Sequence, residues 1–229
     1  TAGRKREVLN ITGFSEGIFP FTYLGAPIIN GHLMKLHLEP IFNRVRKKLG
    51  GWKLKCLSAG GKLILLKHVL ASMPIHIMSI LQLPKGVLKN LNKLLSSFFW
   101  GEKDGKEKKK WVAWKLMCKP TDEGGIGIRE FDEVQTSLHM KFAWKVLTGE
   151  DLWAKFFRAK YIGDKHVSLL DPKKGSRFWK MVVKCIPKVL DNSKWRVRDG
   201  NISFWWDKWL SEGPLANSYP VIDVPRLMV

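Results

Sequence analysis

The most informative run of apolar and polar positions lies between Trp52 and Pro74, in the stretch W-K-L-K-C-L-S-A-G-G-K-L-I-L-L-K-H-V-L-A-S-M-P. Ser58 predicts the start of a helix, because its hydroxyl can accept a hydrogen bond from an unpaired amide of the first turn. Met73-Pro74 predicts the end, since the residue before a proline is disfavoured in the helical region. The apolar residues between them point in nearly every direction around a helical axis, so we expect other helices to surround this one. They are Leu63, Ile64, Leu65, Leu66, Val69 and Leu70.

Two further helices are predicted on either side of this stretch. Near residues 38–49 a basic stripe of Arg44, Lys47 and Lys48 lies opposite an apolar stripe at helical spacing. The apolar stripe consists of Leu38, Phe42, Val45 and Leu49. From Pro84 to Gly101, apolar residues repeat at i, i+3, i+4 and i+7 more regularly than anywhere else in the chain. Three helices in close succession predict a small helical bundle.

Extended structure is predicted near both ends of the chain. Residues 1–30 carry aromatic and β-branched residues, as in Val8–Ile11 and Phe19–Ile29, broken by glycines and prolines, a pattern typical of short strands and turns. Between Trp195 and Trp206, apolar residues alternate at period two around Asp199-Gly200, which predicts a β-hairpin.

The middle of the chain is predicted to be helical after a charged loop. Glu102–Lys110 is a run of charged residues, which is typical of a solvated loop. Helices are then expected from about residues 132, 152 and 178. The apolar stripe of the first of these is Val134, Leu138, Phe142 and Val146. The expected fold is therefore mainly α, with a short β segment at the N-terminus and a β-hairpin near the C-terminus.

The net charge of the chain indicates the kind of partner it binds rather than its fold. Among 229 residues, Lys and Arg number 40 and Asp and Glu 20, for a net charge of +20. That surplus predicts a polyanionic partner, with nucleic acid preferred over an anionic membrane. The longest unbroken apolar runs are only a few residues long, so we expect no membrane-spanning helix and no membrane partner.

The chain's compartment is predicted from its cysteines and its first residues. Cys56, Cys118 and Cys185 are odd in number and far apart, which favours a reducing compartment without disulfides. No signal peptide is visible, because T-A-G-R-K-R-E-V lacks an apolar core segment. We therefore expect a nuclear or cytoplasmic protein. Because it begins with Thr1 rather than Met, we also expect it to be a piece of a longer reading frame.

Two basic clusters are candidates for phosphate contacts. Lys53, Lys55 and Lys62 crowd the amino-terminal end of the central helix, where free amides and the helix dipole favour an anion. The basic stripe near residues 38–49 has no acid on its face, which leaves a phosphate-facing role open. For both clusters the alternative is structural, namely a capped core helix or a surface helix with solvated lysines.

Candidate catalytic and metal chemistry is sparse. The cysteines do not lie at metal-ligand spacing, and His32 and His37 are five residues apart without a partner pair. Gly61-Lys62 does not complete a phosphate-binding loop, since Leu63 stands where Ser or Thr is needed. No G-x-S-x-G nucleophile elbow is present. The adjacent acids Asp122-Glu123 and Asp132-Glu133 do not supply an evident two-metal carboxylate set.

A series of motifs resembles the carboxyl-terminal part of plant LINE-type (non-LTR) reverse transcriptases. They are F-T-Y-L-G-A-P-I from Phe21, the Trp52–Pro74 stretch, L-P-K-G-V to F-F-W-G from Leu83, W-V-A-W from Trp111, E-G-G-I-G-I-R from Glu123 and W-R-V-R-D-G-x-x-x-F-W-W-D-K-W from Trp195. Their order and spacing are similar over nearly the whole chain, and the series is more specific than any one motif.

The resemblance implies a fragment that contains neither active centre of its parent polymerase. It implies the end of a palm at residues 1–30, a helical thumb at 31–101, a charged loop with a helical connection at 102–191, and a hairpin leading into a zinc-binding region at 192–229. Tyr23, Leu24 and Gly25 would form a turn like the primer grip. The catalytic aspartates would lie before Thr1, and the chain itself contains no Asp-Asp pair. The parent polymerase would need Mg, whereas no cofactor is expected in this chain.

The expected partner is an RNA or DNA template–primer duplex, together with the missing palm as an intramolecular partner. The predicted contacts to the duplex come from seven basic side chains, with no catalytic and no metal-binding residue among them. They are Arg44, Lys47, Lys48, Lys53, Lys55, Lys62 and Lys67. The alternative is a decayed or re-used retroelement remnant that acts as a protein-interaction or non-specific nucleic-acid-binding module. An enzyme in its own right is not expected, because no catalytic set is found.

Overall fold

The computed structural model describes residues 2–15, 17–53, 57–103, 106–197 and 202–219. It is mainly helical, as the sequence predicts, and divides into two compact units. Unit 1 comprises residues 1–77 and 86–128, and unit 2 comprises residues 78–85 with the chain from Arg129 onward.

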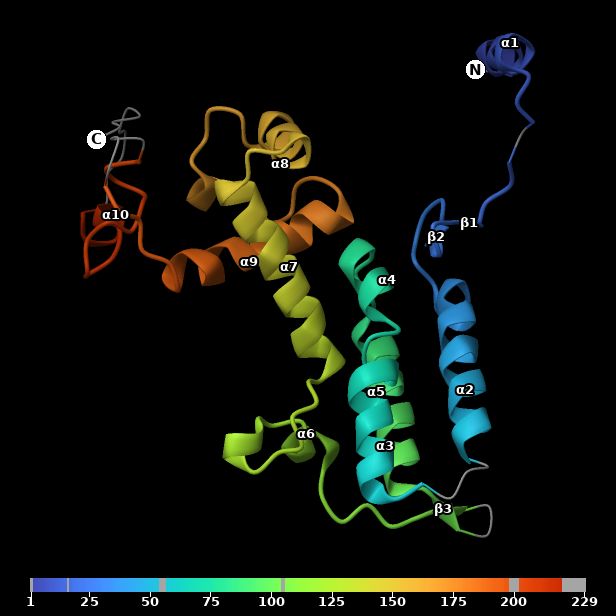
Figure 1. Ribbon diagram of the computed structural model, residues 1–229. Coiled ribbons are helices and arrows are strands. Elements are labelled where there is room, and N and C mark those ends of the chain that lie inside the picture. Colours follow the sequence, from blue (N-terminus) through green and yellow to red (C-terminus); the bar gives the residue numbers. More distant parts are fainter. Residues whose placement is uncertain (1, 16, 54–56, 104–105, 198–201, 220–229) are drawn as a thin grey trace. The chain divides into compact units, whose positions relative to one another are not determined.

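The elements up to residue 128 are mostly helices, with two small β-ladders (Figure 1). The α-helices are α1 (Ala2–Thr12), α2 (Glu39–Lys53), α3 (Ala59–Leu65), α4 (Ile75–Ile80), α5 (Lys85–Trp100) and α6 (Trp114–Met117). The strands are β1 (Phe21–Tyr23), β2 (Ala26–Ile28), β3 (Glu102–Lys103) and β4 (Lys106–Glu107). Short 3₁₀ turns occur at η1 (Lys35–Leu38) and η3 (Thr121–Glu123), and a π-helical turn at η2 (Leu66–Leu70).

Among the residues described after position 128, regular structure is entirely helical. The α-helices are α7 (Phe131–Thr148), α8 (Leu152–Phe157), α9 (Arg177–Asp191) and α10 (Leu215–Ser218). A π-helical turn, η4 (Arg158–Ile162), follows α8, and a 3₁₀ turn, η5 (Val167–Leu169), precedes α9.

The core of unit 1 is formed by the apolar sides of α2, η2 and α5. The stripe predicted near residues 38–49 is confirmed, since Leu38, Phe42, Val45 and Leu49 are all buried. The buried side of α5 follows the predicted repeat, and it includes Val87, Leu88, Leu91, Leu95 and Phe98. Spacing alone predicts the buried residues of α2 and α5, because each helix buries one side only.

The central stretch folds as a capped helix whose apolar residues are not all covered. Ser58 is the N-cap of α3, and its hydroxyl accepts from the amide of Gly61 at 3.2 Å, as predicted. Leu66 and Leu70 are completely buried, whereas Ile64 is 61% exposed. The expectation that other helices surround this one on all sides is therefore wrong, because its apolar residues are buried mainly along one side.

One helical stretch of this region meets the length and composition of a membrane span. Ala59–Ile80 covers 22 residues, and an 18-residue window within it has a mean hydropathy of 1.6, with 28% of that window buried. The count of unbroken apolar runs missed it, because Lys62, Lys67 and Pro74 divide a stretch that is apolar on average. A core helix passes the same test, so the finding concerns length and composition only.

The N-terminal β segment is confirmed, but part of it is helical. β1 and β2 pair antiparallel with Phe21 opposite Ile28 and Tyr23 opposite Ala26. Residues Ala2–Thr12 form α1 instead of the expected extended chain, and Gly13 ends the helix by donating its amide to the carbonyl of Leu9 at 2.9 Å. The strand prediction at Val8–Ile11 was wrong because it gave the two β-branched residues there more weight than the helix-forming residues around them.

The charged run and the C-terminal segment also differ from expectation. Instead of a loop, Glu102–Lys110 contains the antiparallel β3–β4 ladder. In the predicted C-terminal hairpin, Asp199 and Gly200 lie outside the described residues. The described flanks contain no strand, and Ser203 to Asp207 instead closes a helical turn, in which the amide of Asp207 donates to the carbonyl of Ser203 at 3.1 Å.

Unit 2 is built on the packing of α7 against α9. The predicted helix from residue 178 is confirmed as α9, which buries Trp179, Val182, Val183 and Ile186. On α7 the predicted apolar stripe is only half-buried, apart from Val146. The most buried side passes instead through Phe131, Gln135, His139, Ala143 and Val146.

The polar members of this buried side were not predicted because their partners come from elsewhere. Gln135 binds the backbone of Leu83, accepting from its amide at 2.8 Å and donating to its carbonyl at 3.3 Å. A glutamine with both ends paired is compatible with burial, since no polar group is left without a partner. Periodicity cannot show such a contact across 52 positions of sequence.

Candidate nucleic-acid interface

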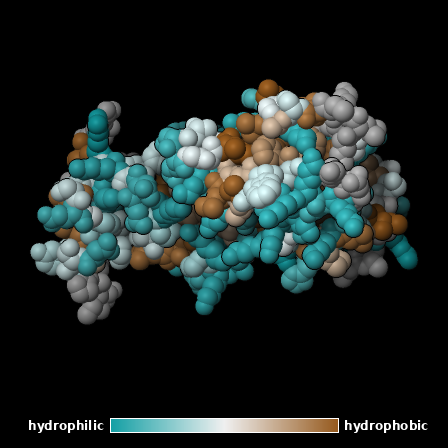
Figure 2. All heavy atoms as spheres, turned by 90° about the horizontal axis from the view of Figure 1, so that it is seen from below, coloured by the Kyte–Doolittle hydropathy of each residue, from teal (hydrophilic) through white to brown (hydrophobic). Residues whose placement is uncertain are grey.

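The exposed side of α2 carries the clearest set of candidate contact residues. Arg44, Lys47 and Lys48 are exposed, whereas Phe42 and Val45 on the opposite side are buried. Among the described residues, none of these three cations makes an ion pair. The face seen in Figure 2 carries many hydrophilic side chains, interspersed with apolar ones. Unpaired cations on one side of a helix can contact successive phosphates of a nucleic-acid backbone without reading its sequence.

A groove between α2 and α5 adds cations that sequence reasoning missed. It encloses about 340 Å³, and Phe42, Leu49 and Phe98 contribute to its apolar walls. Lys35, Arg46, Lys93, Glu39 and Glu107 are its charged lining residues. Arg46 donates to Glu39 at 3.2 Å, so that cation is already paired within the groove. None of the seven predicted contact residues lines this groove.

Glu107 connects the β3–β4 ladder to α5. It accepts a hydrogen bond from the hydroxyl of Ser97 at 2.7 Å and pairs with Lys110 at 3.1 Å. The Ser97 hydrogen bond, with a further contribution from Lys110, lowers the pKa of the Glu107 carboxyl below its ordinary value. The charged run is thus partly fixed by its own contacts rather than free in solvent.

The side chains of Lys62 and Lys67 lie against other residues of unit 1, to which both belong. The ammonium of Lys62 donates to the carbonyl of Phe99 at 3.5 Å, near the end of α5, where the helix dipole favours a cation. The ammonium of Lys67 lies beside Gly127, where an added Cβ would approach it to 3.2 Å. Both side chains are half-buried. Their predicted role as duplex contacts stays a prediction, and their structural contacts were invisible to spacing.

The predicted cluster at the start of the central helix lies only partly within the described residues. Lys53 is the last residue of α2, and Lys55 lies outside the described residues. Lys62 lies in α3, in contact with the end of α5. The structure thus shows Arg44, Lys47 and Lys48 together on one side of α2 and does not bring Lys62 or Lys67 to that side.

The turn at Tyr23, Leu24 and Gly25 joins β1 to β2. Leu24 and Gly25 have φ angles of 48° and 80°, the two positive values that a type I′ hairpin turn requires. The ring of His76 in α4 binds the carbonyl of Leu24 through Nε2 at 2.8 Å. The side chains of Tyr23 and Leu24 are 60% and 75% exposed. The turn is therefore held from its backbone and presents two apolar side chains to solvent.

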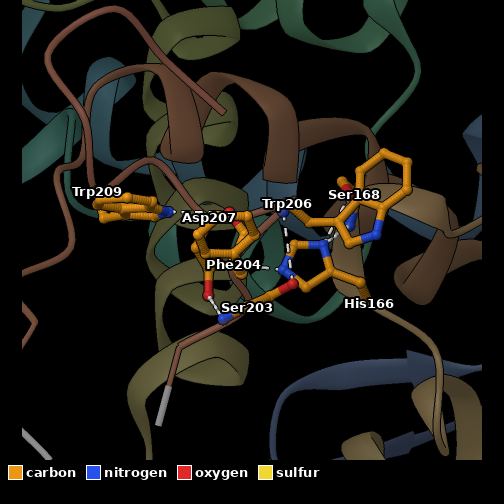
Figure 3. A network of polar contacts seen from close by, with 7 residues as sticks. All are labelled: His166, Ser168, Ser203, Phe204, Trp206, Asp207 and Trp209. Carbon is orange, nitrogen blue, oxygen red and sulfur yellow. Dashed lines mark hydrogen bonds and ion pairs between the residues drawn. The ribbon is translucent and has the colours of Figure 1, made fainter. Parts of the chain in front are cut away.

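In unit 2 a polar network that no sequence pattern indicated joins η5 to the C-terminal segment (Figure 3). The Nε2 of His166 lies 3.1 Å from Asp207 Oδ1, and its Nδ1 lies 2.7 Å from Ser168 Oγ. The amide of Ser168 donates to Nδ1, so the proton of the neutral ring is on Nε2, facing the carboxylate. The second carboxylate oxygen of Asp207 accepts from the amide of Ser203 at 2.7 Å.

This network has a structural role and borders a cavity. His166 is the N-cap of η5, and its contact with Asp207 links two segments that are 41 positions apart. The side chains are only 16% and 12% exposed. Asp207 lies in the motif that begins at Trp195, but His166 lies outside every quoted motif, and no local pattern links the two residues. Across the described part of the chain, no group of three or more His, Cys, Asp or Glu side chains is placed to hold a metal ion.

Two plant proteins are similar to this chain. One, from Arabidopsis thaliana and provisionally named as a ribonuclease H protein (At1g65750), is 34% identical over 195 residues. That alignment covers 82% of this chain but only 32% of the relative, so the chain spans about a third of the relative's length. The other, an uncharacterised mitochondrial protein of the same plant (AtMg00310), is 26% identical over 63% of this chain and 97% of its own length. No protein-family model matches.

These similarities agree with a retroelement-related protein and support the coarser part of the resemblance seen in the sequence. They do not single out a reverse-transcriptase thumb, and one of the names refers to ribonuclease H.

Proposed function

We propose that this chain is the thumb and connection of a retroelement RNA-directed DNA polymerase, and that it grips a template–primer duplex through phosphate contacts. The observation that carries this proposal is the exposed side of α2, where three cations have no ion pair among the described residues and the opposite side is buried. The net charge of +20 supports a polyanionic partner. The chain holds the duplex in place, and the catalytic chemistry belongs to the parent polymerase.

A second part of the proposal concerns the missing palm as an intramolecular partner. Apolar side chains within residues 8–36 are exposed to an unusual degree, which supports an apolar surface that another part of the parent protein covers. They are Val8, Ile11, Phe14, Ile18, Phe19, Phe21, Tyr23, Leu24, Ile28, Met34 and Leu36. In this arrangement the turn at Tyr23–Gly25 would lie beside the primer end.

The same exposed residues favour the alternative, a retroelement remnant that binds other proteins. Light scattering of the purified chain separates the two functions. A monomer that binds duplex favours the thumb, whereas self-association with little duplex binding favours the interaction module. The name of the first relative suggests ribonuclease H as a third function. The described residues of this chain offer no cluster of acids for the metal ions that such phosphodiester hydrolysis uses.

The test is a salt titration of duplex binding, measured by fluorescence anisotropy with a labelled RNA–DNA duplex. Because phosphate contacts release counterions, affinity should fall steeply between about 50 mM and 200 mM salt. The variant Arg44→Gln/Lys47→Gln/Lys48→Gln should lower the slope of log affinity against log salt by about one for each phosphate that is no longer neutralised.

A matched control removes three exposed lysines of unit 2 from α7 and α9, as Lys141→Gln/Lys184→Gln/Lys188→Gln. It lowers the net charge by the same amount but leaves α2 intact, so its salt slope should change less. Equal reductions of the slope in both variants would mean that total charge, not the α2 surface, binds the duplex. A wild-type affinity that does not change with salt would overturn the proposal.

A further inference from the structure

Unit 2 contains a cavity of about 610 Å³ beside the His166–Asp207 pair. Its volume falls in the range of roughly 300–1,000 Å³ that is common for small-molecule sites. Val146, Ile162 and Val167 contribute apolar walls, and the indoles of Trp195 and Trp206 lie at the lining. Figure 3 shows the side chain of Trp206 next to His166, and their ring planes are inclined by only 22°.

Most charged groups around this cavity already have partners within the protein. Arg158 donates to the carbonyls of Val146 and Gly149 and so caps the end of α7. Asp207 accepts from the amide of Ser203 and lies within hydrogen-bond distance of the His166 ring. Apart from His166, the lining carries two cations and two acids whose formal charges cancel, namely Arg158 and Lys165 against Asp164 and Asp207. The interior is thus suited to an uncharged polar ring rather than to a phosphate.

Two donors of the lining remain available. The indole Nε1 of Trp195 is buried and has no hydrogen-bond partner among the described residues. The backbone of Trp195 is fixed, because its amide donates to the carbonyl of Lys208 at 2.9 Å. The ammonium of Lys165 is exposed and makes no ion pair within the described part of the chain. A buried donor without a partner beside a cavity indicates a missing acceptor.

We propose that this cavity binds one unpaired nucleobase of a nucleic-acid strand. The base would stack on the indole of Trp206, since such stacking tolerates any base. The Nε1–H of Trp195 would donate to a ring nitrogen or carbonyl oxygen of the base, and Lys165 would contact the adjacent phosphate. This assignment rests on the proposed nucleic-acid function and gives unit 2 a role distinct from the duplex contacts of α2.

The first experiment compares a blunt RNA–DNA duplex with the same duplex carrying a single-nucleotide overhang. The full chain should bind the overhang duplex roughly five- to thirtyfold more tightly, as expected for one stacked and hydrogen-bonded base. Trp195→Phe retains an aromatic ring but removes the donor, so this preference should fall about three- to tenfold. Binding to the blunt duplex should not change. Trp144→Phe, which alters a half-exposed tryptophan of α7 outside the cavity, is the matched control.

A second measurement does not depend on duplex binding. With 5-fluorotryptophan incorporated, Trp195→Phe identifies the ¹⁹F resonance of Trp195 in the wild-type spectrum. Titration with AMP, GMP, CMP and UMP should shift that resonance, and Lys165→Gln should weaken the response.

The outcomes separate this inference from the proposed function. If the duplex binds with steep salt dependence but neither the overhang preference nor the ¹⁹F shift appears, the nucleobase site is wrong and the thumb function stands. If mononucleotides shift the Trp195 resonance but the blunt duplex does not bind, the nucleobase site stands and the thumb function fails.

Discussion

On α2, Arg44, Lys47 and Lys48 project from the helix without an ion pair among the described residues. In unit 2, several basic side chains of the same kinds are instead engaged by the protein. Lys145 pairs with Asp151 at 2.7 Å and lies 5.2 Å from the centre of the Trp153 ring, and Lys160 lies over two aromatic rings. Arg158 binds two backbone carbonyls. A net charge therefore predicts the kind of partner, but not which cations are available to it.

The second difference lies in the cores. The core of unit 1 consists mainly of aliphatic residues on α2 and α5, whereas unit 2 stacks aromatic rings between α8, η4 and α9. Tyr161 and Trp179 are nearly parallel, at 12° and 4.7 Å between ring centres, and Phe157 lies 5.6 Å from Trp179. We therefore expect unit 2 to depend on a few large side chains.

The largest expected effect comes from Trp179→Ala in that aromatic core. Trp179 is 2% exposed, and removing a buried tryptophan should lower the free energy of unfolding of unit 2 by about 3–5 kcal/mol. Denaturant titration with hydrogen exchange of the α9 amides measures the change. Trp144→Ala, on a side chain that is 48% exposed, is the control and should cost far less. Similar losses of stability in Trp179→Ala and Trp144→Ala would show that the aromatic core does not contribute more to stability than an exposed tryptophan.

The next effect tests the difference between engaged and available cations directly. Arg158→Met retains most of the stem but leaves the carbonyls of Val146 and Gly149 without their charged donor. Unfolding should become easier by about 1.5–3 kcal/mol, the range for hydrogen bonds to charged groups. Arg44→Met should change the free energy of unfolding by no more than about 0.5 kcal/mol, as for an ordinary surface position. Thermal and chemical denaturation of both variants measures the two losses of stability. A larger loss in Arg44→Met than in Arg158→Met would contradict the prediction.

A smaller effect depends on pH and arises from His139, which is completely buried on α7. Burial lowers the pKa of His139 below its ordinary value of 6.5, and the backbone of Gln135 offsets this only in part. No partner within hydrogen-bond geometry is found for either ring nitrogen among the described residues. When the pH falls below the ordinary pKa of histidine, His139 of the unfolded chain binds a proton, whereas buried His139 of the folded chain does not. The free energy of unfolding is therefore highest above that pKa and decreases as the pH falls.

One proton changes the free energy of unfolding by at most about 1.4 kcal/mol per pH unit. Unfolding titrations of unit 2 between about pH 7.5 and pH 5.5 should show this decrease in the wild type and a weaker dependence in His139→Leu. The carboxyl groups of Glu107 and Asp151 have lowered pKa values and titrate below this window. Identical pH profiles for wild type and variant would exclude His139 as the cause.

How far the sequence predicts the structure differs between the two units for a physical reason. The buried stripe of α2 and its basic opposite side followed from spacing, because both depend on one helix alone. The buried side of α7 did not, since Gln135 is buried through its bonds to Leu83 and those lie outside any local pattern. Likewise, the place of Lys62 at the start of a helix makes it a candidate phosphate contact, whereas its contact with Phe99 depends on tertiary packing.

The candidate sites show the same limit. The turn at Tyr23–Gly25 was found from a motif, and the structure confirms a turn there. His166, Asp207 and the cavity beside them depend on two segments that meet only in the folded chain. In the C-terminal segment, period-two alternation predicts a hairpin, but the described flanks of its turn contain no strand. Alternation records which side chains are apolar, and a tight turn can bury them as well as a strand.

The smallest expected effect concerns the turn that joins β1 to β2. Leu24 has a φ of 48°, a left-handed conformation that costs a residue with a branched side chain about 1–2 kcal/mol. Asparagine tolerates this conformation, so Leu24→Asn should stabilise unit 1 by about 0.5–1 kcal/mol while its carbonyl still binds His76. If the exposed leucine serves the primer end, the same variant should also weaken duplex binding. A gain in stability with unchanged binding would show that the side chain of Leu24 has no part in gripping the duplex.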